Sequence, residues 1–384
     1  MELFPALLIG GPPHSGKSVL AYNLSQAFRQ AGLDHYLLRA CPDGEGDWAN
    51  EIDQSVVRTI RLKGEWSLAW VDQICRDIAR RHLPLLVDVG GRPEPWQERI
   101  FSHCTHAVLL APTVTALNEW RSYAQRYGLT ILAELESSLT EPAALWAERP
   151  VFRARLAGLE RGCSQQGSAF AALVDRLSAY FRYPESELRH LHLSSAPVET
   201  VIDLDRLART LDVWFEGQRP TWQPRHLPEV LDYLPAGQPL GLYGRGPNWL
   251  YTAVALHCQP APFYQFDVRL GWVTAPRLAL GLPPTGSPLR CEVTSKSELI
   301  RFNFVIQPAY LDYTEAAELT ILIPPRHKSL VIGGKIPHWL TTALAVAYRY
   351  VPVLAVHQPQ IGHVVVSAQE GSYTPGQILP DTVA

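Results

Sequence analysis

The sequence predicts an α/β protein in which a domain built on a parallel sheet is followed by two smaller domains of mixed strands and helices. Three observations support this prediction. Short apolar runs alternate with helix-length amphipathic segments in the first half of the chain, which is typical of a parallel sheet covered by helices. A glycine-rich loop joins the first apolar run to the first amphipathic segment. In the second half, one pattern of residues occurs twice, about ninety residues apart, which indicates an internal duplication.

The N-terminal domain, residues 1–182, is expected to alternate strands and helices. Each expected strand is a short run of apolar residues, whereas the expected helices carry apolar residues at spacings of three and four. The expected strands are 7–10, 35–39, 83–89, 106–111, 129–134 and 153–159, and the expected helices are 18–29, 68–81, 115–127 and 168–181.

The duplicated half is expected to form two α+β domains, residues 183–285 and 286–384, with a linker rich in Gly and Pro at 280–288. A strand at 190–193 and a helix at 200–211 are expected before the first copy of the pattern. In the second domain the expected strands are 299–306, 319–323, 330–332, 353–356 and 363–367, with a turn or helix at 313–318 and a helix at 337–349.

Composition and charge exclude several classes of protein. The formal net charge is −3, so we expect no general attraction to DNA or to other long nucleic acids. The six cysteines are scattered without CxxC spacing, which argues against a zinc ribbon and a disulfide framework and favours a reducing compartment. The chain start lacks the basic segment of an export signal, and no apolar run approaches membrane-spanning length. We therefore expect a cytoplasmic protein with no membrane or DNA partner.

One segment matches the GxxxxGK[ST] pattern of a phosphate-binding loop and lies between an expected strand and an expected helix. In such loops backbone N–H groups and the positive end of the helix surround the phosphates, Lys17 neutralises the terminal phosphates, and Ser18 offers a hydroxyl to Mg²⁺. We therefore expect ATP and Mg²⁺ as ligands. The loop consists of Gly11, Pro12, Pro13, His14, Ser15, Gly16, Lys17 and Ser18.

An acidic residue, Asp88, ends the apolar run 85–87, where folds of this kind place their second metal-coordinating residue. Ser18 and Asp88 are thus the expected metal ligands, with an ordinary Asp at a strand end as the alternative for Asp88. Two further sets of charged residues are more typical of the protein surface than of a site. They are the arginines Arg149, Arg153, Arg155 and Arg161, which are candidates for phosphate contacts, and the acidic residues Asp43, Glu45 and Asp47.

The duplicated pattern combines a glycine-rich loop, a Trp-Leu pair that opens an apolar helix, and a strand that ends in polar residues. A loop of this kind frees backbone N–H groups for a ligand, and an arginine in it suits phosphodiester oxygens. The first copy also has Asp267 and Arg269 at its strand end, where the second copy has Gln358 and Gln360. We therefore expect the first copy to carry the residues that act on a ligand and the second copy to have a structural role. The expected ligand-binding residues are Gly244, Arg245, Gly246, Pro247 and, in the second copy, Lys335.

These residues resemble the Csx-three (Crn-three) family, small CRISPR-associated proteins of type III systems that are ring nucleases and manganese-dependent deadenylases. Residues 237–275 are similar to the family's SGRGPxWL and DPRLG signatures, and residues 297–380 resemble them in degenerate form. Fusion to a P-loop (AAA-like) ATPase domain is known in this family. The resemblance implies ferredoxin-like domains, a homo-oligomer, Mn²⁺, and cleavage of cyclic tetraadenylate with Asp267 as the acid and Arg269 as the essential arginine.

The chain departs from the family's histidine pattern, because Leu278 and Gln369 stand where the family has a histidine after the DPRLG glycine. His257 is the candidate substitute for catalysis, with a structural helix histidine as the alternative. Three functions stay open. The first is an ATP-binding accessory protein that degrades cyclic oligoadenylate and switches off the antiviral response. The second is a non-cleaving sensor of cyclic oligoadenylate or an RNA 3′ end that controls the ATPase domain, and the third is a P-loop nucleotide or small-molecule kinase.

Overall fold

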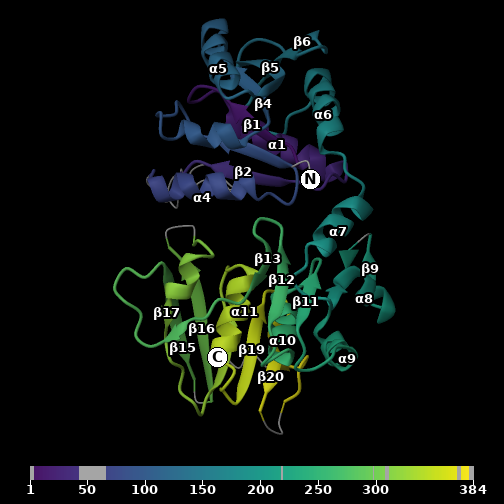
Figure 1. The fold of residues 1–384 in the computed structure, drawn as a ribbon, viewed down its shortest axis with the longest axis vertical. Coiled ribbons are helices and arrows are strands. Elements are labelled where there is room, and N and C mark those ends of the chain that lie inside the picture. Colours follow the sequence, from purple (N-terminus) through teal and green to yellow (C-terminus); the bar gives the residue numbers. More distant parts are fainter. Residues whose placement is uncertain are drawn as a thin grey trace. The chain divides into compact units, whose positions relative to one another are not determined.

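The computed structural model describes residues 4–42, 66–217, 219–296, 298–307, 311–369 and 373–379. The chain forms two compact units (Figure 1). The first unit comprises Met1–His192 together with the four-residue segment Val268–Gly271, and the second comprises Leu193–Asp267 and Trp272–Ala384. No helix in the described ranges is both long enough and apolar enough to cross a membrane.

The first unit is built on a seven-stranded sheet with the strand order β2-β3-β1-β4-β5-β7-β6. Neighbouring strands from β2 to β7 run parallel, and β6 pairs antiparallel with β7. The parallel sheet predicted from the sequence is therefore confirmed, with β6 as an unexpected addition. The strands are β1 Ala6–Gly10, β2 Tyr36–Ala40, β3 Leu85–Val89, β4 His106–Ala111, β5 Thr130–Ser138, β6 Ala144–Ala147 and β7 Phe152–Ala157.

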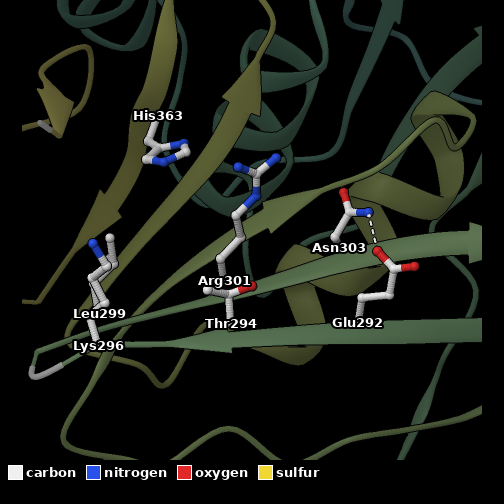
Figure 2. A pocket seen from close by; sticks show the side chains of 7 residues that line it. All are labelled: Glu292, Thr294, Lys296, Leu299, Arg301, Asn303 and His363. Carbon is white, nitrogen blue, oxygen red and sulfur yellow. Dashed lines mark hydrogen bonds between the residues drawn. The ribbon is translucent and has the colours of Figure 1, made fainter. Parts of the chain in front are cut away.

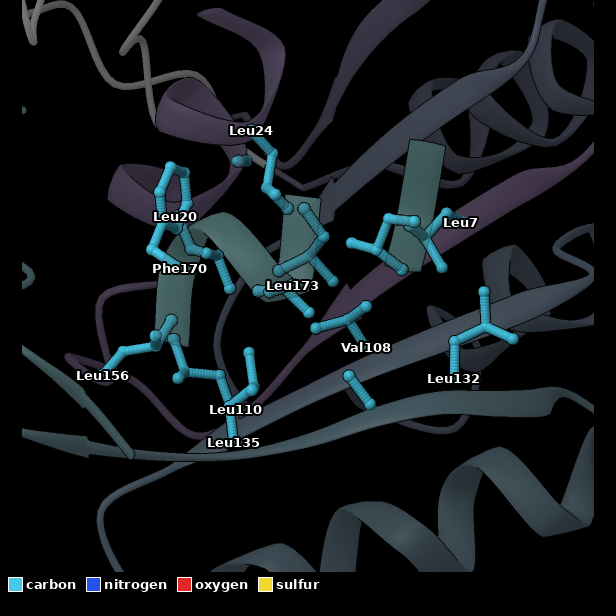
Figure 3. Close-up of a cluster of buried hydrophobic side chains, with 14 of the residues drawn as sticks. Leu7, Leu20, Leu24, Val108, Leu110, Leu132, Leu135, Leu156, Phe170 and Leu173 are labelled. Carbon is cyan, nitrogen blue, oxygen red and sulfur yellow. The ribbon is translucent and has the colours of Figure 1, made fainter. Parts of the chain in front are cut away.

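Two hydrophobic clusters lie on opposite faces of this sheet. Successive side chains of a strand point to opposite faces, so β1 sends Leu7 and Ile9 into one cluster and Ala6 and Leu8 into the other. The first cluster includes residues of α1 and α6 (Figure 3), and the second includes residues of α4 and α5. The helices are α1 Lys17–Gln30, α4 Leu68–Ala79, α5 Val114–Arg126, α6 Ser168–Phe181 and α7 Glu185–Ser194, with a 3₁₀ helix at Glu98–His103.

Two of the elements expected from the sequence, both within residues 190–211, are wrong. The expected strand at 190–193 lies inside helix α7, where Leu188 and His192 are buried one turn apart. Four alternating residues are too few to separate a two-residue period from a helical one. The expected helix at 200–211 instead begins as strand β8, Val201–Asp203. Helix α8, Leu204–Thr210, starts there because the Asp203 carboxylate caps it, accepting from the backbone N–H groups of Asp205 and Arg206 at 3.0 and 3.2 Å.

The second unit contains a four-stranded sheet, β13-β12-β11-β8, and a six-stranded sheet, β15-β16-β18-β19-β20-β21. Two short pairs, β9 with β10 and β14 with β17, accompany them. The remaining bounds are β9 Phe215–Glu216, β10 Arg219–Pro220, α9 Leu227–Tyr233, β11 Leu240–Tyr243, α10 Asn248–His257, β12 Phe263–Asp267, β13 Gly271–Thr274, β14 Ala279–Leu280, β15 Leu289–Ser295, β16 Leu299–Ile306, β17 Thr320–Ile321, β18 Ser329–Gly333, α11 His338–Ala347, β19 Val353–Gln358, β20 Gly362–Ala368 and β21 Ile378–Leu379, with 3₁₀ helices at Pro224–His226 and Glu315–Glu318.

The two copies of the duplicated pattern share one topology. In the first, β11 is joined to its parallel neighbour β12 through α10, and β8 lies parallel on the other side of β11. In the second, β18 is joined to its parallel neighbour β19 through α11, and β16 lies parallel on the other side of β18. Equivalent tryptophans, Trp249 and Trp339, are buried at the start of the two helices. An internal duplication accounts for this match, while the domain limits at 182, 285 and 286 stay a prediction.

The expectation of ferredoxin-like domains needs correction. In that fold a third strand splits the βαβ unit, so the two strands joined by a helix are not neighbours. Here the strands joined by α10, and those joined by α11, pair directly in parallel register. The second unit therefore contains mixed sheets with unsplit βαβ units. The helices α10 and α11 pack on each other, and the buried hydroxyl of Thr342 donates to Gln265 Oε1 at 3.1 Å.

Candidate functional site

The glycine-rich loop follows the carboxyl end of β1, which lies between β3 and β4 in the sheet. A Cβ atom on Gly11 would lie 2.0 Å from the carbonyl oxygen of Leu110, so this position accepts no side chain. Gly16 has a left-handed φ of 91° immediately before α1 begins at Lys17. The local structure is thus the strand, loop and helix that the phosphate-binding motif requires.

Lys17 is buried in this loop, and its Nζ donates to the carbonyl oxygen of Pro12 at 2.7 Å. Burial lowers the pKa of the Lys17 ammonium, and the nearby Asp88 carboxylate acts in the opposite direction. A cation is therefore held inside the loop by one carbonyl oxygen and one carboxylate.

Asp88 lies beside the loop because it pairs in register with Ile9 on β1 and with Arg39 on β2. It is fully buried, and Arg39 forms an ion pair with its Oδ2. Among the described residues, no group donates a hydrogen bond to Asp88 Oδ1, and Ser15 Oγ also lacks a partner. Oxygens of this kind are the ligands that Mg²⁺ and its bound waters prefer, so the loop and Asp88 fit a magnesium nucleotide. Ser18, the other expected metal ligand, lies in the first turn of α1.

The arginine candidates for phosphate contacts lie elsewhere in the first unit. Arg153 Nε donates to Glu134 Oε2 at 3.1 Å, and Arg155 Nε donates to Glu136 Oε1 at 2.8 Å, both across the β5–β7 pair. Glu134 also accepts from Arg121 Nε at 2.6 Å. These arginines balance carboxylates on a neighbouring strand. Arg149 and Arg161 are exposed, and Asp43, Glu45 and Asp47 lie outside the described residues.

The second candidate site lies where the two copies of the duplicated pattern meet. Helix α10 follows the loop with Gly244, Arg245, Gly246 and Pro247, and α11 follows the equivalent loop with Lys335. Gly244 and Gly334 have left-handed φ values of 114° and 123°. Arg245 and Lys335 are both exposed. Each helix therefore presents a cation beside its positively polarised N-terminus.

Tyr251 connects the two loops. Its buried ring lies against the ring of His338, the first residue of α11, with centroids 4.7 Å apart and planes inclined by 34°. Its hydroxyl donates to the carbonyl oxygen of Gly244 at 2.5 Å. Because Tyr251 comes from the first copy and His338 from the second, one site contains residues of both copies.

Asp267 is the last residue of β12, which pairs parallel with β11, so Asp267 lies at the same end of the sheet as the loop that follows β11. Burial raises the pKa of the Tyr251 hydroxyl, and the Asp267 carboxylate raises it further. The imidazole of His338 is exposed on one side and packed on the other. The lost hydration on the packed side lowers its pKa, while the charge of Asp267 acts in the opposite direction. An acid and a histidine whose charges interact are therefore present beside two cationic loops.

His257, the histidine that the sequence suggested for catalysis, lies away from this site. It ends α10, and its Nε2 is 3.0 Å from the carbonyl oxygen of Leu234. Because α10 runs antiparallel to β11 and β12, its last residue lies near the amino ends of these strands, whereas Asp267 lies at the carboxyl end of β12. Arg269 lies in the turn Val268–Gly271 of the first unit, with Nε 4.0 Å from Asp77 Oδ2.

Sequence reasoning missed Tyr251 and His338, whose rings contact each other although they lie far apart in the sequence. His338 occupies the position that Asn248 holds in the first copy, so comparison of the copies would have singled it out. The described residues contain no group of three or more His, Cys, Asp or Glu side chains that could hold a metal ion. The described ranges therefore contain no such set of ligands for the manganese that the resemblance implies.

Comparison with known proteins gives similarities of two kinds, to a family model and to solved structures. A family model described as "CRISPR-associated protein (Cas_csx3)" matches residues 306–380, so the chain carries a domain of this type at its C-terminal end. The match falls on the second copy, although the sequence signatures are stronger in the first. The septum site-determining protein MinD complexed with Mg-ADP from Pyrococcus horikoshii OT3 is a similar solved structure, with 12% identity, a TM-score of 0.28, and coverage of 35% of this chain and 70% of that chain. No curated protein matches the chain.

Proposed function

We propose that this protein is a type III CRISPR accessory protein that binds ATP at its glycine-rich loop and cyclic oligoadenylate at the loops of its duplicated half. One observation carries this proposal. Tyr251 of the first copy stacks on His338 of the second, beside the exposed cations Arg245 and Lys335 of the two loops. The C-terminal match to the CRISPR-associated family supports the biological context.

The ligand is inferred from the charge and the duplication of the site. Two packed helices present their N-termini, and each N-terminus carries a glycine-containing loop with one cation. Such loops bind phosphate through backbone N–H groups and side-chain charge. Two of them side by side favour a ligand with several phosphates, such as a ring of adenylates, over a single phosphate. Cyclic tetraadenylate is the member of this class that the sequence resemblance implies.

Cleavage of the bound oligoadenylate is the second candidate function, and the lowered pKa of His338 beside the two loops favours it. A lowered pKa leaves more of the imidazole neutral at pH 7, so His338 is able to accept the proton of a ribose 2′-hydroxyl. The freed oxygen attacks the adjacent phosphorus, and the bond from phosphorus to the 5′ oxygen breaks. The leaving oxygen takes the proton from the imidazolium. The products are a 2′,3′-cyclic phosphate and a 5′-hydroxyl end, and Asp267 stabilises the transient imidazolium.

In the first unit, we propose that Lys17 contacts the terminal phosphates of ATP and that Ser18 and Asp88 hold Mg²⁺. When bound, the ion would neutralise negative charge on the phosphates. The hydrogen bond from Lys17 Nζ to the Pro12 carbonyl keeps the ammonium within the loop, so that binding exchanges this carbonyl for phosphate oxygens. Hydrolysis of ATP is the activity that this set of residues supports.

The experiment that tests the proposal incubates the purified protein with radiolabelled cyclic tetraadenylate, with and without ATP and with Mg²⁺ or Mn²⁺. In a filter-binding assay, we expect the wild type to bind the labelled cyclic tetraadenylate. We also expect it to release linear products with 2′,3′-cyclic phosphate ends. His338→Gln should retain the ring without cutting it, whereas the matched control His257→Gln should cut normally. Retention without products in the wild type would favour the sensor. No retention at all, or transfer of the ATP γ-phosphate to an added nucleotide, would contradict the proposal.

A further inference from the structure

A hollow lies on the six-stranded sheet, on the face opposite α11 (Figure 2). Residues alternate along β16, so Phe302 packs against Tyr348 at the end of α11 while Arg301 and Asn303 point to the other face. The hollow has a volume of about 270 Å³. It is lined by Glu292, Thr294, Lys296, Leu299, Arg301, Asn303 and His363.

Strand pairing brings the polar side chains of this hollow together. In the antiparallel pair β15–β16, Thr294 lies opposite Arg301 and Glu292 lies opposite Asn303. Asn303 Nδ2 donates to Glu292 Oε2 at 3.1 Å. The carboxylate in the hollow is therefore engaged by an amide, and Arg301 does not use it as a counter-ion.

Arg301 is the residue that indicates a ligand. Its Nε is shielded from solvent and has no hydrogen-bond partner, and within the described ranges the guanidinium forms no ion pair or hydrogen bond. Arginine stays protonated in proteins, so this site holds a partly desolvated positive charge without a protein acceptor. Such an arrangement is unfavourable for the protein alone and becomes favourable when an anion binds.

The floor and rim of the hollow leave room for that anion. A Cβ atom on Gly333 would lie 3.3 Å from Asn303 Oδ1 and 3.4 Å from Arg301 Nε, so the glycine allows both polar groups to lie low on the sheet. At the rim, Lys328 Nζ donates to the Lys296 carbonyl oxygen at 2.7 Å and holds the end of β15, near which Lys296 lines the hollow.

We propose that this hollow binds a phosphate carried on a ribose, with Arg301 and Lys296 contacting the phosphate and with Glu292 and Asn303 contacting the sugar or the base. Two cations face one carboxylate, which favours an anionic ligand. Carboxylate and amide side chains commonly bind ribose hydroxyls and adenine edges. Ligand pockets usually measure about 300–1,000 Å³, so the hollow suits a ligand no larger than one nucleotide. It shares no residue with the site of Asp267 and His338 and does not rest on the function proposed there.

The test uses the full-length chain with Lys17→Ala and Arg245→Ala, which weakens phosphate binding at the other two sites. AMP, ribose 5-phosphate and inorganic phosphate are titrated into it by calorimetry. Adding Arg301→Met should weaken AMP binding about tenfold or more, as expected for loss of a charge-assisted contact. The matched control is Arg349→Met, which removes the same charge from an exposed arginine whose Nη1 donates to the Val346 carbonyl, and it should leave the affinity unchanged.

A second readout separates a ligand contact from a structural role. Because Arg301 has no protein acceptor in the described ranges, Arg301→Met should keep or raise the melting temperature, whereas an arginine that supports the fold would lower it. Equal effects of Arg301→Met and Arg349→Met on AMP affinity, or a lower melting temperature for Arg301→Met, would overturn the proposal. Equal affinity for AMP and inorganic phosphate would overturn the contacts assigned to Glu292 and Asn303.

Discussion

The ring of His338 lies on the ring of Tyr251, 4.7 Å between centroids, although the two residues belong to different copies of the duplicated pattern. The equivalent positions in the other copy are Asn248 and Thr341, and Gln358 stands where the first copy has Asp267. The acid and the tyrosine are therefore present only in the first copy, and the histidine is present only in the second. We expect one reactive centre in each chain.

The charge of Asp267 predicts the direction of a measurable shift in the pKa of His338. The carboxylate raises the pKa of the imidazole, so Asp267→Asn should lower it further below the ordinary value. Histidine proton resonances followed during a pH titration give this pKa directly. The control is Asp232→Asn, which removes an exposed carboxylate from the end of α9. An unchanged titration of His338 in the Asp267 variant would show that the two groups do not interact.

Lys17→Ala should abolish detectable ATP binding and leave the fold intact. The ammonium contacts one loop carbonyl and is expected to contact the terminal phosphates of ATP, and it contributes no apolar packing. A loss of at least about tenfold is expected from one charge-assisted contact. Fluorescent ATP titration together with circular dichroism checks both parts. Normal ATP affinity in this variant would refute the assignment of the loop.

Arg153→Ala should have the reverse effect, with lower stability and unchanged ATP affinity. Arg153 is one of two arginines on the buried carboxylate of Glu134, and its own side chain is half exposed. A partly exposed ion pair contributes about 0.2–1 kcal/mol, so a small decrease in the free energy of unfolding is expected. Urea denaturation measures it. Weaker ATP binding in this variant would restore Arg153 as a phosphate contact.

Acidification should destabilise the first unit through His192. Burial lowers the pKa of this imidazole below 6.5, although its hydrogen bond to the His82 carbonyl, 2.7 Å long, opposes the shift. Below pH 6.5 the unfolded chain therefore binds more protons than the folded chain, and the free energy of unfolding falls as the pH falls. His192→Gln keeps a donor for the carbonyl and removes the titration. Urea denaturation at pH 7.5 and 5.5 should show a smaller pH dependence in the variant, and an equal dependence would contradict this account.

Elements buried on both faces were predictable from the sequence. All five residues of β1 and of β3 are buried, and apart from Asp88 and Gly10 they are apolar, while the expected helix at 168–181 is α6 with the same bounds. Strand β15 was missed because most of its residues are exposed and it is defined by pairing with β16. Strand β6, with its exposed Trp146, was missed for the same reason. Strands at a sheet edge carry little apolar pattern of their own.

The two candidate sites also differ in how far the sequence predicts them. Lys17 belongs to a contiguous motif whose chemistry is local, so the sequence predicts its role and its neighbours. The contact of Tyr251 with His338 depends on the packing of α10 against α11, which no spacing in the sequence specifies. The choice of His257 failed to find this site because His257 ends α10, whereas the loop with Arg245 precedes the start of that helix. The histidine that contacts Tyr251 is instead His338, at the start of α11.

The most direct test of the central claim is a calorimetric titration of cyclic tetraadenylate into the wild type and into a variant with Arg245→Ala and Lys335→Ala. Both cations are exposed, so the variant should fold normally. Two charge-assisted contacts are worth about 1.5–3 kcal/mol each, and we predict wild-type binding that is weakened by about a hundredfold or more in the variant. Absence of binding to the wild type, or equal affinity in both proteins, would contradict the claim that these loops hold the ligand.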